Sequence, residues 1–463
     1  MSASRRQFLR QATALAAAAP AFAGLSACAV DGADTSDTMA GALVSDPEGW
    51  LDLPPGFTYT RFSPTGARMS DGLLTPGDHD GMAAFPVEGD PDRCLLVRNH
   101  ELSPDQFDMS AFADGGTLAA NLVYDTDGQG RPHAGGTTTL LYNLRTRSLE
   151  RAHLSLAGTE RNCAGGPTPW GSWLTCEETL TRAGHKAERD HGYVFEVPAT
   201  ATRAVTPVAL TAMGRFNHEA CAVDPRTGIV YQTEDDGEGL FYRLLPDRPG
   251  DLAKGGRLQA LALAQAPGAD TRNWGTADTI PVGEALDVRW VDLDAIDNPD
   301  NDLAQRGFAS GAARFARGEG MAWAIDRAGA SVYFACTSGG PARAGQIWRY
   351  QPSPQEGTPG EAQSPGRLVL HYESPNRAAV DMCDNIVAAP WGHLILCEDG
   401  KADEFVKGLT PDGRLYPIAR NAHPDKSEFA GACFAPDGET LFVNVQSPGA
   451  TYAIRGPWAQ IAV

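Results

Sequence analysis

The chain has 463 residues and a formal net charge of −20, with 58 acidic against 38 basic side chains. Nucleic-acid-binding proteins carry a basic surface, so this charge argues against that class of function. It is compatible with solubility or with bound cations that offset the acidic side chains. A chain of this length can bury a large core, and closed β architectures often reach it as a single domain.

Residues 1–28 are predicted to be a twin-arginine export signal of the lipoprotein type. Two arginines at positions 5 and 6 precede an Ala-rich apolar run that is too short to span a membrane. Residues 25–28 fit a lipoprotein cleavage box with Cys28 as the lipidated residue, and a simple cut near residues 21–23 is the alternative. Residues 29–45 are small, polar and acidic, and are expected to form a flexible tether. We therefore expect a periplasmic or cell-surface protein that touches a membrane only through a lipid anchor.

One pattern recurs through the rest of the chain. A short apolar run leads to a turn of the Pro/Asp-Gly type, and a second apolar run then ends in a polar cluster rich in Asp or Glu. The runs are rich in Val, Leu and aromatic residues and are bounded by Gly and Pro, which is typical of strands joined by hairpins. Six copies occur, at residues 80–101, 162–178, 218–236, 317–338, 384–399 and 428–446.

Short strands on a recurring unit predict an all-β, six-bladed β-propeller with long loop insertions. The catalytic domain is expected to cover residues 46–463 and to be a monomer. The insertions, at residues 103–135, 246–314 and 351–367, are rich in Gly, Pro and Asp and are expected to be surface loops. A pair of packed β-sandwich sheets is the alternative fold.

The hairpins predict where the acidic side chains lie. Each copy has one polar residue before its first strand and another at the end of its second, and antiparallel partners start and finish on the same side. If these are the inner strands of the blades, the pairs converge at the mouth of the central channel, joined by Glu319 and Glu428. The expected pairs are Asp80 with Glu101, Cys163 with Glu178, Glu219 with Glu234, and Asp384 with Glu398.

So many carboxylates cannot all ionise at close quarters unless cations neutralise them. Oxygen ligands suit Ca²⁺, whereas a thiolate at Cys163 points to a softer metal such as iron, and a merely buried thiol is the alternative there. The neighbouring histidines at 79, 100 and 218 are expected to orient ligands rather than to bind metal. The predicted metal ligands are Glu101, Cys163, Glu178, Glu219, Glu234, Asp235, Glu319, Asp384, Glu398 and Glu428.

Arg317 stands two residues before Glu319 and should lie at the rim of the same mouth. A guanidinium beside a cluster of cations suits phosphate recognition, because it combines charge with bidentate hydrogen bonding. A salt bridge that only balances nearby acids is the alternative. No Ser or Cys with an adjacent His base was found, so a covalent route is not expected.

From about Asp71 to Trp458 the sequence resembles the PhoX family of bacterial alkaline phosphatases. The resemblance implies a six-bladed propeller, exported by the twin-arginine route, that hydrolyses small phosphate monoesters at a cluster of Fe³⁺ and Ca²⁺. It implies that Cys163 binds iron, that Glu319 is among the metal ligands and that Arg317 binds phosphate, so these three are the predicted catalytic residues. The segments that carry the resemblance are residues 71–82, 98–101, 162–178, 214–219, 233–237, 345–350, 384–385, 397–400 and 428–431.

Two departures from the family pattern and two rival functions stay open. Many members have Arg-Pro-Glu where this chain has Arg317-Gly318-Glu319, so the pose of the arginine is less rigidly fixed; the chain is also shorter than the larger members. A calcium-dependent propeller hydrolase of lactones or phosphotriesters is the first rival, and the number of acids and Cys163 argue against it. A non-catalytic surface propeller stabilised by metal is the second, and the presence of Arg317 argues against it.

Overall fold

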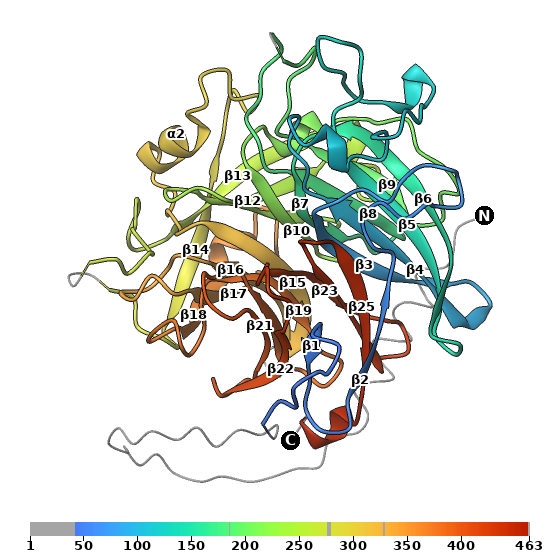
Figure 1. The fold of residues 1–463 in the computed structure, drawn as a ribbon. Helices are drawn as coiled ribbons and strands as arrows, with labels where there is room; N and C mark the ends of the chain where they lie inside the picture. Colours follow the sequence, from blue (N-terminus) through green and yellow to red (C-terminus); the bar gives the residue numbers. More distant parts are fainter. Residues whose placement is uncertain (1–41, 185, 276–278, 327–328, 462–463) are drawn as a thin grey trace.

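The computed structural model describes residues 42–461, apart from residues 185, 276–278 and 327–328. The predicted export signal and most of the predicted tether lie outside the described residues. Antiparallel strands joined by loops and short 3-10 helices make up the described part, with the short helix α2 (Leu303–Ala309) on the periphery (Figure 1). No helix among the described residues has the length and apolar character needed to cross a membrane.

The strands form five hydrogen-bonded sheets. The first sheet in chain order contains β3 (His79–Val87), β4 (Asp90–His100), β5 (Gly135–Asn143) and β6 (Ser148–Thr159). The second contains β7 (Asn162–Pro167), β8 (Ser172–Glu177) and β9 (Val194–Pro198). The third has nine strands and starts with β10 (His218–Val223), β11 (Val230–Glu234), β12 (Phe241–Pro246), β13 (Gly256–Leu263) and β14 (Ala285–Asp292). That sheet continues through β18 (Arg367–Glu373), β17 (Gln346–Gln351), β16 (Gly329–Cys336) and β15 (Gly318–Asp326).

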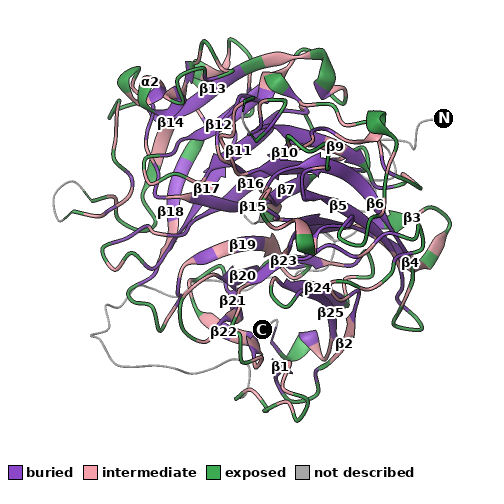
Figure 2. Ribbon diagram, turned by 45° about the horizontal axis from the view of Figure 1, so that its top comes forward, coloured by how far each residue is buried: buried purple, intermediate pink, exposed green. Residues whose placement is uncertain are grey.

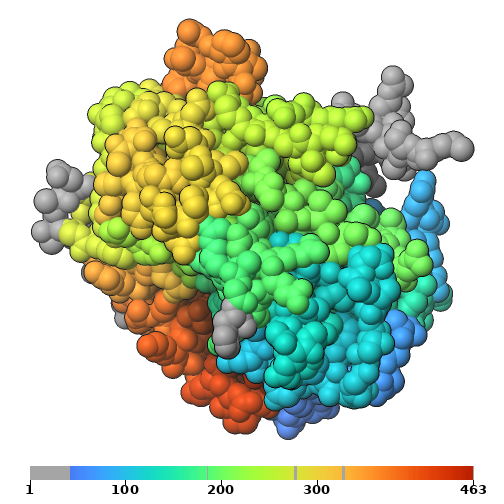
Figure 3. All heavy atoms as spheres, turned by 90° about the horizontal axis from the view of Figure 1, so that it is seen from above, coloured from blue at the N-terminus to red at the C-terminus, as the bar shows by residue number. Residues whose placement is uncertain are grey.

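The last two sheets join the ends of the chain. One pairs β19 (Cys383–Ala388), β20 (Leu394–Glu398), β21 (Phe405–Leu409) and β22 (Leu415–Asn421) with the early strand β1 (Leu51–Asp52). The other pairs β23 (Phe429–Phe434), β24 (Thr440–Val445) and β25 (Ala450–Arg455) with β2 (Thr58–Phe62). In Figure 3 the colours accordingly run round the molecule until blue residues lie beside red ones. Pairing strands from the two ends closes the circle of sheets.

The arrangement of the sheets is propeller-like. The first strand of each repeat packs beside the next, in the order β3, β7, β10, β15, β19, β23 and back to β3, and these strands gather at the centre of Figures 1 and 2. Hydrophobic side chains fill the spaces between neighbouring sheets, and the strands are mostly buried along their length (Figure 2). This circular packing excludes the sandwich alternative, because a sandwich has only two facing sheets.

The loop prediction for residues 246–314 is wrong in part. Residues 256–263 form β13 and residues 285–292 form β14, and the second half of β13 is buried. The β13 sequence from Leu258 to Leu263 is apolar at five of six positions, a pattern typical of a strand, and the Gly and Asp residues around it obscured this signal. β14 pairs with β18, which merges two runs of strands into one sheet.

The eight described cysteines are all buried, and none of them forms a disulfide. Cys176 and Cys397 are wholly enclosed within β8 and β20. They act as small hydrophobic side chains, as their apolar sequence context predicts.

Candidate metal centre

A β-bulge interrupts the first strand of every repeat near its start, one residue later in β23 than in the other five. In β3, for example, the pairs His79–His100 and Met82–Arg98 leave two residues of the first strand opposite one of the second. Bulges of this kind bend a strand and re-aim a side chain, and they are common beside functional sites. The same irregularity occurs in β7, β10, β15, β19 and β23.

The bulges place ligand-type side chains in one cavity. The first bulged residue is a potential ligand in five repeats, and in the sixth it is Gly431. The cavity has a volume of about 210 Å³, and its lining is almost wholly polar. The lining residues are Asp80, Glu101, Arg161, Cys163, Glu178, Glu219, Asp235, Arg317, Glu319, Asp384, Asp399, Glu428 and Gln446.

In five of the six hairpins the residue that follows the last paired position of the second strand lines the cavity; in the sixth that residue is Thr337, which does not. β4 ends at His100 and Glu101 lines the cavity; β8 ends at Glu177 and Glu178 does so. The amide of each such residue donates to a carbonyl just before the first strand, for example Glu178 N to Arg161 O at 2.9 Å. The two ends of every hairpin are thereby tied together beside the cavity.

Eight of the ten predicted ligands line this cavity, but Glu234 and Glu398 do not. Each is the last residue of its strand, and side chains alternate between the two faces of a strand, so the following residue faces the cavity instead. Glu234 accepts hydrogen bonds from Tyr242 Oη at 2.6 Å and from the Leu240 amide. Glu398 pairs with Lys407 at 2.7 Å.

Sequence reasoning missed three lining residues, Arg161, Asp399 and Gln446. A signal for the first was available: Arg161 stands two residues before Cys163, as Arg317 stands two before Glu319. Both arginines have left-handed backbone, with φ of 44° and 55°. Asp399 follows Glu398 as Asp235 follows Glu234. Once the residue after the second strand is known to face the cavity, the repeat predicts Asp399 as a lining residue.

The thiol of Cys163 lies between two carboxylates. Its Sγ is 2.9 Å from Glu219 Oε2 and 3.5 Å from Glu178 Oε2. Burial, and then the charge of these acids, raise the pKa of the Cys163 thiol well above its ordinary value. A thiol that faces carboxylates is a poor nucleophile for an anion, whereas the same three atoms form a set of donors for a cation.

The other acids of the cavity are held in a similar environment. Burial raises the pKa of Glu178 to about 8 and the pKa of Asp384 to about 7, and neighbouring carboxylates add to both shifts. Burial and neighbouring acids also raise the pKa of Glu219 well above its ordinary range. Such a cluster is stable in ionised form only with cations present. Three groups of donors have the spacing of a metal site: Asp80 with Glu101 and Cys163; Cys163 with Glu178 and Glu219; and Glu219 with Glu319 and Asp384.

Two arginines hold the rim of the cavity. Arg317 forms a bidentate ion pair with Asp235 and also approaches Glu319 at 3.1 Å. Its backbone is fixed too, because its amide donates to Asp236 O at 3.0 Å. The orientation of the Arg317 guanidinium is therefore fixed even though this chain has Gly318 where many family members have proline. Arg161 pairs with Glu101 at 2.5 Å and with Glu178.

The neighbouring histidines are buried and do not line the cavity. His79 Nε2 lies 3.0 Å from Pro76 O, and His100 Nδ1 lies 2.8 Å from Gly77 O. His218 Nε2 lies 3.0 Å from Gly214 O. All three thus fix the loop that precedes a hairpin, which in turn positions the acids beside them.

The fold and the cavity together define an all-β, propeller-like protein with a buried cluster of carboxylates, a thiol and two arginines at its centre. The family model for alkaline phosphatase PhoX matches residues 38–449, so the chain belongs to this family and is a phosphoric monoester hydrolase. The resemblance noted in the sequence is thereby confirmed. No curated protein matches the sequence well enough to count as a relative.

A solved structure of low sequence identity shares the fold. PhoX from Pseudomonas fluorescens, solved in complex with vanadate, a transition-state analogue, has a TM-score of 0.67 at 18% identity and covers 91% of this chain and 97% of its own. A gluconolactonase from Xanthomonas campestris has a TM-score of 0.40 at 14% identity, covering 90% of this chain and 98% of its own. The second likeness is too distant to support any argument.

Proposed function

We propose that the chain hydrolyses phosphate monoesters at a cluster of iron and calcium ions held in the central cavity. The observation that carries this proposal is the convergence of one thiol, nine carboxylates and two arginines on one cavity. Carboxylates alone would suit many cation sites. The thiol and the arginines add a softer ligand and a means of binding an oxyanion.

The donor groups fit the two kinds of cation. Cys163 with Glu178 and Glu219 combines a thiolate with two carboxylates, a set that suits iron. Glu219 with Glu319 and Asp384 offers only oxygens, a set that suits calcium. Asp80 and Glu101 would complete the cluster on the other side of Cys163. Bound cations would polarise the phosphoryl oxygens as Lewis acids and offset their charge.

The protein's own side chains orient the substrate. Arg317 and Arg161 reach the rim from equivalent positions of two repeats, where guanidinium groups can bind two oxygens of a phosphate. The carboxylates that pair with them, Asp235 and Glu101, hold both guanidinium groups in place before substrate arrives. Prepositioned donors cost no reorganisation as charge develops on the phosphoryl group, so they favour the transition state.

Further parts of the proposal concern architecture and location. The nine-stranded sheet counts as two blades joined through β14 and β18, which gives six blades around the ring of first strands. The protein is exported by the twin-arginine route to the periplasm or cell surface, with a lipid anchor on Cys28, and acts as a monomer on small phosphorylated substrates. Twin-arginine export carries folded proteins, which suits a cofactor inserted before export.

The test combines activity with metal content. Native protein should release phosphate from an aryl phosphate at alkaline pH, should contain both iron and calcium, and should lose activity in chelator. Glu219→Gln should lose both metal and activity, because Glu219 belongs to two of the donor groups. Calcium without iron, together with hydrolysis of lactones or phosphotriesters only, would favour the rival hydrolase. Metal content with no ester hydrolysis would favour a structural role.

A further inference from the structure

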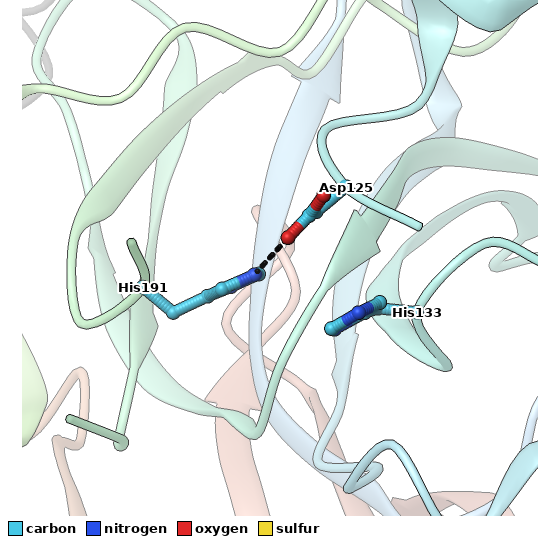
Figure 4. Close-up of side chains that lie close together, drawn as sticks. All are labelled: Asp125, His133 and His191. Atoms are coloured by element: carbon cyan, nitrogen blue, oxygen red, sulfur yellow. Dashed lines mark hydrogen bonds and ion pairs between the residues drawn. The ribbon is translucent and has the colours of Figure 1, made fainter. Parts of the chain in front are cut away.

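A second cluster of ionisable side chains lies behind the wall of the cavity. It consists of Asp125, His133, Glu160, Glu177 and His191, all of which are at most 3% exposed. Asp125 and His133 come from the segment before β5, Glu160 from the turn between β6 and β7, and His191 from the segment before β9. Figure 4 shows the His191 ring pointing at Asp125, with His133 beside it. Burying three carboxylates so close together is costly unless positive charge accompanies them.

Three residues of this cluster, Asp125, His133 and His191, offer ligand atoms within 4.8 Å of one another, and Glu160 approaches both histidines. Asp125 Oδ2 is 3.1 Å from His191 Nε2, and Glu160 Oε1 is 3.8 Å from the same nitrogen. Glu160 Oε1 is 2.7 Å from His133 Nδ1. Ligands of a tetrahedral zinc ion at about 2.0 Å from the metal are about 3.3 Å apart. The observed separations bracket this value.

The opposite edge of each imidazole ring is fixed by an acceptor. His191 Nδ1 lies 2.6 Å from Glu177 Oε1, and His133 Nε2 lies 3.1 Å from the carbonyl oxygen of Lys186. Carboxylate and carbonyl oxygens only accept, so these ring nitrogens carry the protons. The other nitrogens also face carboxylate oxygens, Asp125 Oδ2 for His191 and Glu160 Oε1 for His133, so each holds either a second proton or a metal ion. The same outer hydrogen bonds orient histidines that bind metals.

Two atoms that face the centre of the cluster lack a hydrogen bond. Glu160 Oε1 and His133 Nδ1 are close, but their approach is misaligned, and neither has a hydrogen-bond partner of acceptable geometry. Glu160 Oε2, by contrast, accepts from Thr181 Oγ1 at 2.7 Å. Two buried polar atoms in contact without a well-aligned hydrogen bond are costly, and a cation bound to both would satisfy them.

We propose that Asp125, His133, Glu160 and His191 bind a Zn²⁺ ion, with Glu177 orienting His191. Two imidazole nitrogens among the donors favour zinc over calcium or magnesium. The ion would join the segment before β5 to the sheet of β7, β8 and β9. Glu160 and Glu177 directly precede Arg161 and Glu178, so the ion would also brace the wall of the central cavity. None of its four ligands lines that cavity.

A pair of protonated histidines is the competing arrangement. The two rings are nearly parallel, at an interplanar angle of 6° and a centroid distance of 5.0 Å. Two imidazolium rings would neutralise the carboxylates without an ion. Zinc binding would turn the rings out of parallel, so that both lone pairs point to one centre.

Diffraction from crystals of native protein soaked in Zn²⁺, recorded on both sides of the zinc absorption edge, tests the proposal directly. We expect an anomalous peak between Asp125 Oδ2 and His191 Nε2, at about 2.0–2.2 Å from the four ligand atoms. Zinc absorption spectra should show nitrogen and oxygen ligands with imidazole. A peak only in the central cavity, or a sulfur ligand, would place zinc on Cys163 and overturn the proposal.

Variants give a second readout that is separate from phosphatase activity. His133→Gln and His191→Gln should each lose one equivalent of zinc and keep the other metals. His153→Gln, at a buried histidine outside both clusters, is the control and should keep zinc. Adding Zn²⁺ to zinc-depleted wild type should raise Tm by several degrees, because the ion binds only the folded chain. Unchanged zinc content in both variants, or no shift in Tm, would show that two protonated histidines, and not a zinc ion, neutralise the buried carboxylates.

Discussion

Arg317 and Asp235 form a bidentate ion pair across the rim of the central cavity, with Nε and Nη2 each 2.7 Å from a carboxylate oxygen. Asp235 follows β11, whereas Arg317 precedes β15, so the pair links two neighbouring repeats. Lysine keeps the charge of arginine but cannot form two parallel hydrogen bonds. The orientation of this guanidinium is therefore a property that substitution can test separately from its charge.

Arg317→Lys should lower kcat/KM for an aryl phosphate by about 10²–10³-fold, the usual loss when an oriented donor to developing charge is removed. The measurement is steady-state kinetics, with metal content determined on the same sample. Arg314→Lys is the matched control, because Arg314 pairs with Glu238 and does not line the cavity. Equal activity of both variants would contradict the assigned role of Arg317.

Neighbouring acids on β11 and just after it should differ sharply in effect. Asp235→Asn should lower activity at least tenfold, because Asp235 lines the cavity and holds Arg317. Glu234→Gln should keep full metal content and lose only about 1–3 kcal/mol of stability, because it weakens buried hydrogen bonds from Tyr242 and Leu240. Kinetics, elemental analysis and urea unfolding of both variants check this. Metal loss in Glu234→Gln would show that the Glu234 side chain faces the cavity, contrary to the register of β11 described above.

Hairpin geometry alone predicts from the sequence that the acids lie together. Antiparallel strands begin and end on the same side, so Cys163 and Glu178 could be paired without a structure. The predicted ligands Glu234 and Glu398 each lie one residue before the side chain that faces the cavity, because side chains alternate along a strand and a shift of one position reverses the face. Each first strand also contains a bulge, and an extra residue of this kind leaves no mark in the hydrophobic pattern.

The ring of strands was likewise predictable from repetition, while the peripheral structure was not. Strand β13 lies within a Gly- and Asp-rich insertion, and its short apolar run was outweighed by its surroundings. The second cluster was missed for a different reason. Asp125 and His133 precede β5 and His191 precedes β9, without a recognisable spacing, and only folding brings them together.

Metal-free protein should become less stable as pH rises from about 4.5 towards 9. Folding raises the pKa of Glu178 to about 8 and of Asp384 to about 7, above the values in an unfolded chain. The folded state thus holds more protons than the unfolded state in this range, so deprotonation favours unfolding. Calorimetry in chelator should show Tm falling over this interval.

Cations should reverse this trend, because they bind the ionised acids. Calcium affinity should rise with pH through about 8, and binding in weakly buffered solution should release protons. Titration calorimetry in two buffers of different ionisation enthalpy measures that release. Affinity that is constant from pH 6 to 9 would show that the acids are already ionised without metal.

Gly81→Ala should disturb the ring of first strands at the point where β3 meets β7. A Cβ at this position would lie 2.6 Å from Ala164 Cα and 2.8 Å from Cys163 O, and backbone atoms cannot move aside cheaply. We expect a loss of about 1–3 kcal/mol in urea unfolding, as for other overpacked sites, and a lower iron content because Cys163 is displaced. Gly275→Ala, where the new carbon meets open space, is the control and should change neither property. Wild-type stability and iron content in Gly81→Ala would mean that the strands are less closely packed here and that glycine is not required for the metal centre.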